Sequence, residues 1–380
     1  MLSFVILKLI WWVLVGVLLI GFAIMDGHDM GVGTLLPFVG KGDTERRVVI
    51  NTVAPHWDGN QVWFITGGGA IFAAWPFVYA TAFSGFYWAM LAVLWSLFFR
   101  PVGFDYRSKI ESPLWRKTWD IGLFIGGFVP PVIFGVAFGN LLQGVPFYFD
   151  DTLMPHYTGT FWALLNPFAL VCGLVSSAMI TFHGAVYLMH RTIGDVHARA
   201  RKAASVFGPL ALALFALAGI WIARGGIDGY AITSVLDPAS LPNPLAKDVA
   251  RVAGGWLENY HRWPIAMTAP LLAFVAGLAA TALARAGRTG LAFIGSSLMM
   301  TGIITTAGVS MFPFIMPSSS DPRSSLTVWD STSSHLTLSI MFWAVVIFMP
   351  LIIFYTQWAY RVMAGKVTPE YIEKNKKTVY

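Results

Sequence analysis

Two short polar stretches interrupt the long apolar segments near the N-terminus. The first is DGHDMGVG, residues 26–33, and the second is HWDGNQVW, residues 56–63. An ionised carboxylate at membrane depth costs from about 3 to more than about 10 kcal/mol. A membrane helix that keeps such groups therefore turns them toward protein or trapped water. A hydrogen-bonded chain of carboxylate, amide, imidazole and water can also carry a proton through the hydrocarbon layer.

The spacing within these stretches places polar groups on shared helix faces. Asp26 and Asp29 are three residues apart, and His56 and Asn60 are four apart. Asp58 follows a basic loop by about ten residues, which is roughly 15 Å deep along an unbroken helix. We predict that Asp58, His56 and Asp29 belong to a proton route. The alternatives are a buried hydrogen-bond network that joins helices and, for Asp26 and Asp29, a solvated helix end.

A third polar group follows the next apolar segment. Arg100 ends that segment, and Asp105 and Lys109 come directly after it. We expect Arg100 to pair with Asp29 or Asp58, and Asp105 and Lys109 to join the same proton route. The alternatives are that Arg100 anchors a helix end and that Asp105 and Lys109 form a solvated pair worth little free energy.

The composition indicates an integral membrane protein. Of the 380 residues, 56% are hydrophobic and 12% are charged, whereas soluble domains carry about 25% charged residues. Apolar runs of roughly 20 residues are typical of membrane helices and longer than barrel strands. The net charge of +6 lies between the apolar runs, so nucleic acid is not an expected partner. The single cysteine, Cys172, excludes an internal disulfide and a Cys-ligated iron–sulfur cluster within this chain.

The hydropathy pattern predicts an all-α bundle of about nine transmembrane helices. We expect residues 1–380 to form a single membrane domain with no soluble domain. The apolar segments are 5–36, 48–74, 77–99, 118–142, 161–189, 203–223, 264–284, 289–312 and 336–359. With these segments, nineteen of the 25 Lys and Arg residues fall on one side of the membrane. The positive-inside rule then places the N-terminus in the periplasm and the C-terminus in the cytoplasm. We also expect a short interfacial helix within residues 247–260.

Histidines are the side chains most able to bind haem. Of the eight in the chain, only His28, His56 and His183 lie within apolar segments. Nothing in their spacing predicts haem ligation. We therefore expect no catalytic residue, directly bound cofactor or metal ion in this chain. Gly27 and Gly31 form a small-xxx-small pair that lets another helix approach closely.

Several motifs resemble subunit II of bacterial cytochrome bd-type quinol oxidases. These are DGHDMGVG, APHWDGNQVW, the run from Trp75 to Tyr87, FFRPVGFDYR, FGNLLQGVPF, MFPFIMPSS and SLTVWD. The likeness extends from the first helix to the C-terminal tail. One departure is His28, where the family usually carries a phenylalanine, and this argues against His28 as an essential haem ligand.

The resemblance implies a complex that oxidises quinol, reduces dioxygen to water and takes protons from the cytoplasm, which builds a proton gradient. It implies haem b, haem d and the quinol site in subunit I, a pseudo-symmetric heterodimer, and small single-helix accessory subunits among membrane lipids of the bacterial inner membrane. By the same resemblance Asp58 lines a proton channel and Trp63 lies near an oxygen route.

The alternative function is a secondary transporter, with Asp29 and Asp58 as coupling carboxylates. An inverted repeat would favour a transporter, and none is evident.

Overall fold

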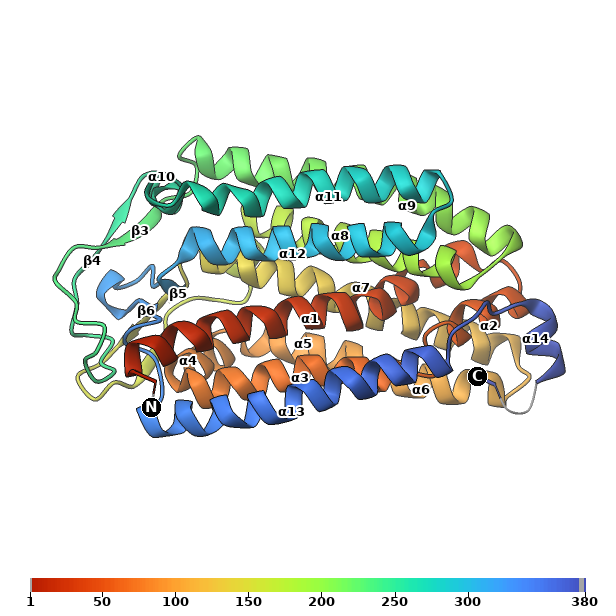
Figure 1. Ribbon diagram of the computed structural model, residues 1–380, viewed down its shortest axis with the longest axis horizontal. Coiled ribbons are helices and arrows are strands. Elements are labelled where there is room, and N and C mark those ends of the chain that lie inside the picture. The colour runs from red at the N-terminus through yellow and green to blue at the C-terminus, as the bar shows by residue number, and fades with distance from the viewer. Residues whose placement is uncertain (1, 376–378) are drawn as a thin grey trace.

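The computed structural model describes residues 2–375 and 379–380, and its long helices run side by side along one axis (Figure 1). Eight segments are long and apolar enough to cross a membrane. They comprise α1 (Phe4–Val39), α5 (Tyr87–Leu97) with α6 (Phe99–Tyr106), α7 (Pro113–Gln143), α8 (Pro167–Arg191), α9 (Gly194–Ala223), α11 (Thr268–Arg285), α12 (Thr289–Met311) and α13 (His335–Val362). α1 packs against α7, α8 and α3, so the polar stretch at residues 26–33 lies inside the bundle.

The second predicted crossing is not one helix. The predicted segment 48–74 divides into α2 (Asp43–Asn51) and α3 (Trp57–Ala74), with a turn at residues 52–56. Pro55 lies in this turn, where it disfavours helical backbone at the preceding residue. The depth of roughly 15 Å expected for Asp58 assumed an unbroken helix, so that estimate does not hold.

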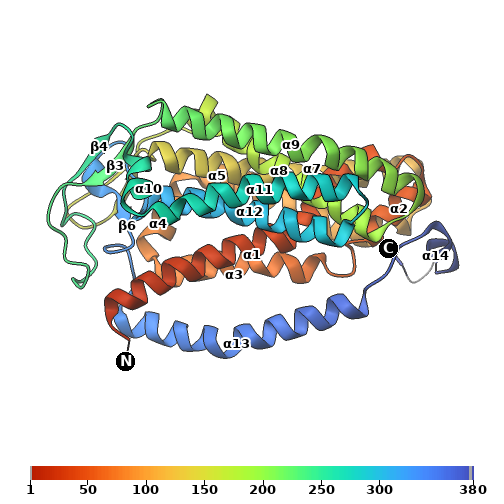
Figure 2. The same cartoon turned by 45° about the horizontal axis from the view of Figure 1, so that its top comes forward.

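α3 corresponds to the one predicted crossing that is missing from these eight apolar segments, so its place as the ninth crossing stays a prediction. Its polar first turns lower its mean hydropathy, which is why it is absent from the eight apolar segments. It packs on α1 and runs beside it in both views (Figures 1 and 2). The two termini lie at opposite ends of the bundle, as an odd number of crossings requires (Figure 1). Which end faces the cytoplasm stays a prediction, as does a single domain spanning residues 1–380.

Breaks at Phe86 and Phe98 divide the third crossing as well. It begins with α4 (Pro76–Gly85), which has proline at its first turn, and continues through α5 and α6. The remaining short helices are α10 (Glu258–Arg262), α14 (Pro369–Lys374) and the 3₁₀ turns Arg107–Lys109, Trp162–Leu165, Gly255–Leu257, Pro264–Met267 and Pro322–Ser324. α2, α6 and α14 lie at the C-terminal end of the bundle, close to the basic loops (Figure 1).

Three antiparallel hairpins cover the N-terminal end. They pair β1 (Phe147–Phe149) with β2 (Pro155–Tyr157), β3 (Gly229–Ile232) with β4 (Val249–Val252), and β5 (Phe314–Met316) with β6 (Leu326–Thr327). The helix expected within residues 247–260 is therefore wrong over most of its length, because the β-branched Val249 and Val252 pair in a strand. Only its last part is helical, in α10. Lys247 forms a buried ion pair with Asp330, with Nζ 2.7 Å from Oδ2, which fastens this loop to the loop before α13.

Glycines allow α1 to approach its neighbours closely. A Cβ added at Gly31 would meet the carbonyl oxygen of Ile180 and lie 2.9 Å from the Cα of Gly184, both on α8. The predicted close approach is thus confirmed at Gly31. At Gly27 a Cβ would only touch the side chain of Met300 at 3.4 Å, so that glycine is not required for backbone contact.

We expect Gly31→Ala to disrupt the α1–α8 crossing. Inserting a methyl group into a packed core costs typically about 1–3 kcal/mol, and here the obstacle is rigid backbone. The amount of monodisperse protein recovered from membranes and its thermal midpoint should both fall. Gly16→Ala on the same helix is the matched control, because nothing lies within 4 Å of its added Cβ. Equal midpoints for the two variants would contradict this account of the crossing.

Candidate functional site

A buried ion pair joins α1 to α6. Arg100 on α6 donates from both terminal nitrogens to Asp26, over 2.9 and 2.5 Å. Gly126 on α7 leaves room for it, since a Cβ there would lie 2.9 Å from the Arg100 Cγ. Both charged side chains are at most 2% exposed. Asp29 lies on the same face of α1, but the distance from its Oδ2 to Arg100 Nη2 is 4.0 Å.

The predicted pairing of Arg100 with Asp29 is confirmed only as a long ion pair of 4.0 Å, and the sequence analysis missed the main partner. The sequence favoured Asp29 or Asp58, whereas the bidentate partner is Asp26. The guanidinium fork matches a single carboxylate in two parallel hydrogen bonds, so Arg100 directly neutralises only one of the two aspartates. Asp29 is left as a buried carboxylate that does not share this bidentate pair.

Polar groups from α1 and α3 surround Asp29. Asn60 donates its amide to Asp29 Oδ2 over 2.8 Å. Asp29 Oδ1 lies 3.2 Å from His28 Nε2 and 3.7 Å from His56 Nδ1. The expected common face of His56 and Asn60 is confirmed, because Asn60 Nδ2 lies 3.1 Å from His56 Nδ1. Within the described chain, Oδ1 is a buried oxygen that accepts no hydrogen bond.

Two tyrosines that the sequence reasoning missed complete this cluster. Tyr360 on α13 donates to Asn60 Oδ1 over 3.0 Å, and Tyr187 on α8 lies 2.8 Å from His56 Nε2. His183 on α8 lies nearby, between Ser296 Oγ at 2.7 Å and the Ile24 carbonyl at 3.1 Å. A buried tyrosine hydroxyl usually has a polar partner, which was the one signal in the sequence for these residues.

The other predicted route residues lie on the outside of the chain. Asp58, Asp105 and Lys109 are all exposed, and no ion pair joins Asp105 to Lys109 in the part of the chain that the structure describes. Asp58 interacts electrostatically with Arg100. The predicted route residues thus form an inner group (Asp29, His56 and Arg100) and an outer group (Asp58, Asp105 and Lys109).

Trp63 packs against α1. A Cβ added at Gly21 would lie 2.5 Å from the Trp63 ring, so this glycine makes room for the indole. The structure gives Trp63 a packing contact, and its place on an oxygen route stays a prediction.

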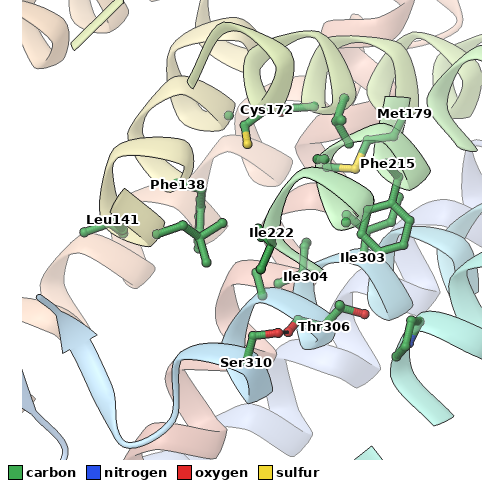
Figure 3. A pocket seen from close by; sticks show the side chains of 18 of the residues that line it. Phe138, Leu141, Cys172, Met179, Phe215, Ile222, Ile303, Ile304, Thr306 and Ser310 are labelled. Atoms are coloured by element: carbon green, nitrogen blue, oxygen red, sulfur yellow. Dashed lines mark hydrogen bonds between the residues drawn. The ribbon is translucent and has the colours of Figure 1, made fainter. Parts of the chain in front are cut away.

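A large apolar cavity of about 730 Å³ lies between the helices (Figure 3). Cys172 and Met179 from α8, Phe215 from α9 and Ile303 from α12 line it, with Thr306 and Ser310 among its few polar groups. None of His28, His56 and His183 lines this cavity.

The three buried histidines do not fit a haem. An axial ligand must point into a space that accommodates the macrocycle, but the ring nitrogens of the three buried histidines face hydrogen-bond partners or Asp29. The space between His28, Asp29 and His56 is closed to a macrocycle by contacts of 3.2 and 3.7 Å.

The geometry can be compared with known proteins. A model of the family described as cytochrome bd terminal oxidase subunit II matches residues 7–363. The chain belongs to this family. Membership makes it a multi-pass subunit of a terminal respiratory oxidase, a haem-containing oxidoreductase complex of the bacterial inner membrane in which it accompanies subunit I. It also replaces the alternative interpretation as a secondary transporter.

Individual relatives support the same assignment. The chain is 56% identical over 380 residues to cytochrome bd-I ubiquinol oxidase subunit 2 of Escherichia coli K12, covering 100% of both chains. It is 33% identical over 364 residues to cytochrome bd ubiquinol oxidase subunit 2 of Bacillus subtilis, covering 94% of this chain and 96% of the relative. A solved structure of bd oxidase from Geobacillus thermodenitrificans shares the fold, with a TM-score of 0.68 at 15% identity, covering 94% and 98% of the two chains.

We expect Arg100→Gln to destabilise the protein strongly. Removing one partner of a buried ion pair typically costs about 3–5 kcal/mol, because the other charge stays buried without compensation. The thermal midpoint of the purified complex should fall, and Arg100→Lys, which keeps the charge but loses the fork, should lose less. Arg224→Gln at an exposed position is the control. An unchanged midpoint in Arg100→Gln would show that the pair does not hold the cluster together.

Proposed function

We propose that this chain is the non-haem half of a quinol oxidase and lines a proton route at its junction with subunit I. The observation that carries the proposal is the exposed carboxylate of Asp58 in the first turn of α3, a helix that packs along the first apolar helix α1. Further along the same helix Val62 and Ile65 are 51% and 66% exposed, which indicates an apolar surface around the acid. A bare carboxylate facing lipid is costly, so in the complex this face needs a protein cover.

Subunit I is the cover that we propose. α13 also offers an almost fully exposed apolar surface beside α3 (Figure 2). Asp58, Asp105 and Lys109 then lie between two protein surfaces, where water can be held and a proton can move without contact with lipid. Asp58 and Asp29 of the inner group both act on the charge of Arg100, which supports a connection between the two groups. In this proposal Asp29 and His56 are the enclosed continuation of the route.

The direction of the route follows from the proposed orientation. The basic end, with α2 and α14, faces the cytoplasm, and the N-terminus faces the periplasm. Protons enter at Asp105 and Lys109 and pass Asp58 toward the haems. Haem b, haem d and the quinol site lie in subunit I, where quinol is oxidised and dioxygen is reduced to water. Trp63 borders an oxygen route, and single-helix accessory subunits and lipids complete the assembly.

We expect Asp58→Asn to lower oxygen consumption of the purified complex at least about tenfold, equivalent to about 1.4 kcal/mol in activation free energy. Haem content and assembly should be unchanged, because the Asp58 side chain is exposed in this chain and asparagine keeps its size. Asp195→Asn is the matched control. Asp195 is an exposed aspartate at the start of α9, across the bundle from α3 (Figure 1).

Two outcomes would overturn this assignment. Loss of assembly or of haem in Asp58→Asn, with full turnover per remaining haem, would make Asp58 a structural residue. Wild-type turnover with intact haem would remove Asp58 from the proton route altogether.

A further inference from the structure

Four electron-pair donors converge inside the buried cluster. Asp29 Oδ1 lies 3.2 Å from His28 Nε2 and 3.7 Å from His56 Nδ1. The Tyr360 hydroxyl oxygen, from α13, lies 3.4 Å from the same His28 nitrogen and 3.5 Å from the same His56 nitrogen. His28, Asp29 and His56 are all buried, and their nitrogen and oxygen atoms lie within 4.8 Å of one another.

The tautomer of each histidine follows from its neighbours. His28 Nδ1 lies 3.0 Å from the Ile24 carbonyl oxygen, which can only accept, so Nδ1 carries the hydrogen. His56 Nδ1 faces the amide nitrogen of Asn60 at 3.1 Å, which can only donate, so the His56 hydrogen is on Nε2. In the neutral rings, both lone pairs therefore point inward at Asp29.

This arrangement leaves an electrostatic problem at Asp29. Its Oδ1 accepts no hydrogen bond among the described residues, and the nearest ring nitrogen presents a lone pair to it. Arg100 is held by Asp26 and stays 4.0 Å from the other oxygen of Asp29. Two acceptors facing each other at 3.2 Å in a buried site are stabilised by a hydrogen or a cation between them.

We propose that a divalent transition-metal ion of the zinc class binds between His28 Nε2, Asp29 Oδ1 and His56 Nδ1, with the Tyr360 hydroxyl as the fourth ligand. Ligand atoms about 2.0–2.1 Å from zinc lie roughly 3.3 Å from one another in a tetrahedron. Four of the six ligand–ligand distances here lie between 3.2 and 3.7 Å, close to that edge length, and the ligand atoms of His28 and His56 lie within 4.8 Å of each other.

The surroundings match those of a metal site. The outer N–H of each metal-bound histidine normally donates to a backbone carbonyl or similar group, which fixes the ring. Here His28 donates to Ile24, and His56 donates toward the Thr52 carbonyl at 3.1 Å and the Tyr187 hydroxyl at 2.8 Å. Binding requires one exchange, in which His56 gives up its hydrogen bond from Asn60. Imidazole ligands favour zinc and its neighbours, whereas calcium and magnesium select oxygen ligands.

This inference goes beyond the proposed function and does not rest on it. A metal ion bound in the cluster would exclude Asp29 and His56 from the proton route proposed above, and that route would then run through the outer group of Asp58, Asp105 and Lys109 alone. It also differs from the sequence-based expectation of no metal site. The reason is that Tyr360 and His28 are far apart in the sequence and come together only in the fold.

The test measures zinc directly in the assembled complex. Purified complexes are treated with a chelator, dialysed against Zn²⁺ and analysed for zinc. The haem iron content gives the number of complexes to which the zinc content is normalised. We expect the wild type to retain about one zinc ion more per complex than His28→Phe. His183→Phe is the matched control, because both ring nitrogens of His183 are engaged by Ser296 and Ile24, and it should retain the wild-type amount.

Equal zinc contents in the wild type and His28→Phe would overturn the proposal. The zinc absorption edge of the wild-type complex provides a second test that does not depend on whether the variants assemble. It should show imidazole nitrogens and oxygen at about 2.0–2.1 Å, and a shell with sulfur or with oxygen alone would contradict the site. Since this readout is independent of turnover, its failure leaves the role of Asp58 untouched, and a failure of Asp58→Asn leaves the metal site untouched.

Discussion

The bidentate bond between Arg100 and Asp26 is the interaction on which the polar interior depends. It fixes α6 against α1 and places a permanent positive charge next to two aspartates, of which it fully satisfies one. Charges taken out of water must be paired and hydrogen-bonded. The second aspartate, Asp29, therefore determines what surrounds it: an amide from Asn60, two imidazoles and a tyrosine. The same unbalanced charge makes this cluster suited to a proton or to a metal ion.

The polar groups of this chain form two sets, one buried between the helices and one exposed on the surface of the bundle. The inner group is enclosed within the single chain by hydrogen bonds between α1, α3, α8 and α13, although Asp29 Oδ1 accepts none among the described residues. The outer group, centred on Asp58, is exposed beside apolar side chains. An acid in that position is expensive in lipid. In an enzyme built from two membrane subunits, this division assigns the outer group to the junction and the inner group to the chain itself.

The sequence predicted best those features that depend on neighbouring residues, such as apolar helices and the faces that residues three or four apart share. Hydropathy located the apolar helices, and helix spacing correctly placed His56 with Asn60 on one face. It failed where distant segments decide. Tyr360 reaches Asn60 across 300 positions, and no local pattern indicates that contact. The position of the Arg100 side chain depends on how closely α6 packs against α7 at Gly126, and the sequence does not indicate this packing. The break near Pro55 was visible in the sequence but was outweighed by the apolar run around it.

The most direct test is an experimental structure of the intact oxidase with ordered water resolved at the junction. Our account predicts that the Asp58 carboxylate is covered by subunit I and connected through water to Asp105 on the cytoplasmic side. A carboxylate that faces lipid, or one that is closed off from both the cytoplasm and the haems of the partner, would contradict the role assigned to this chain.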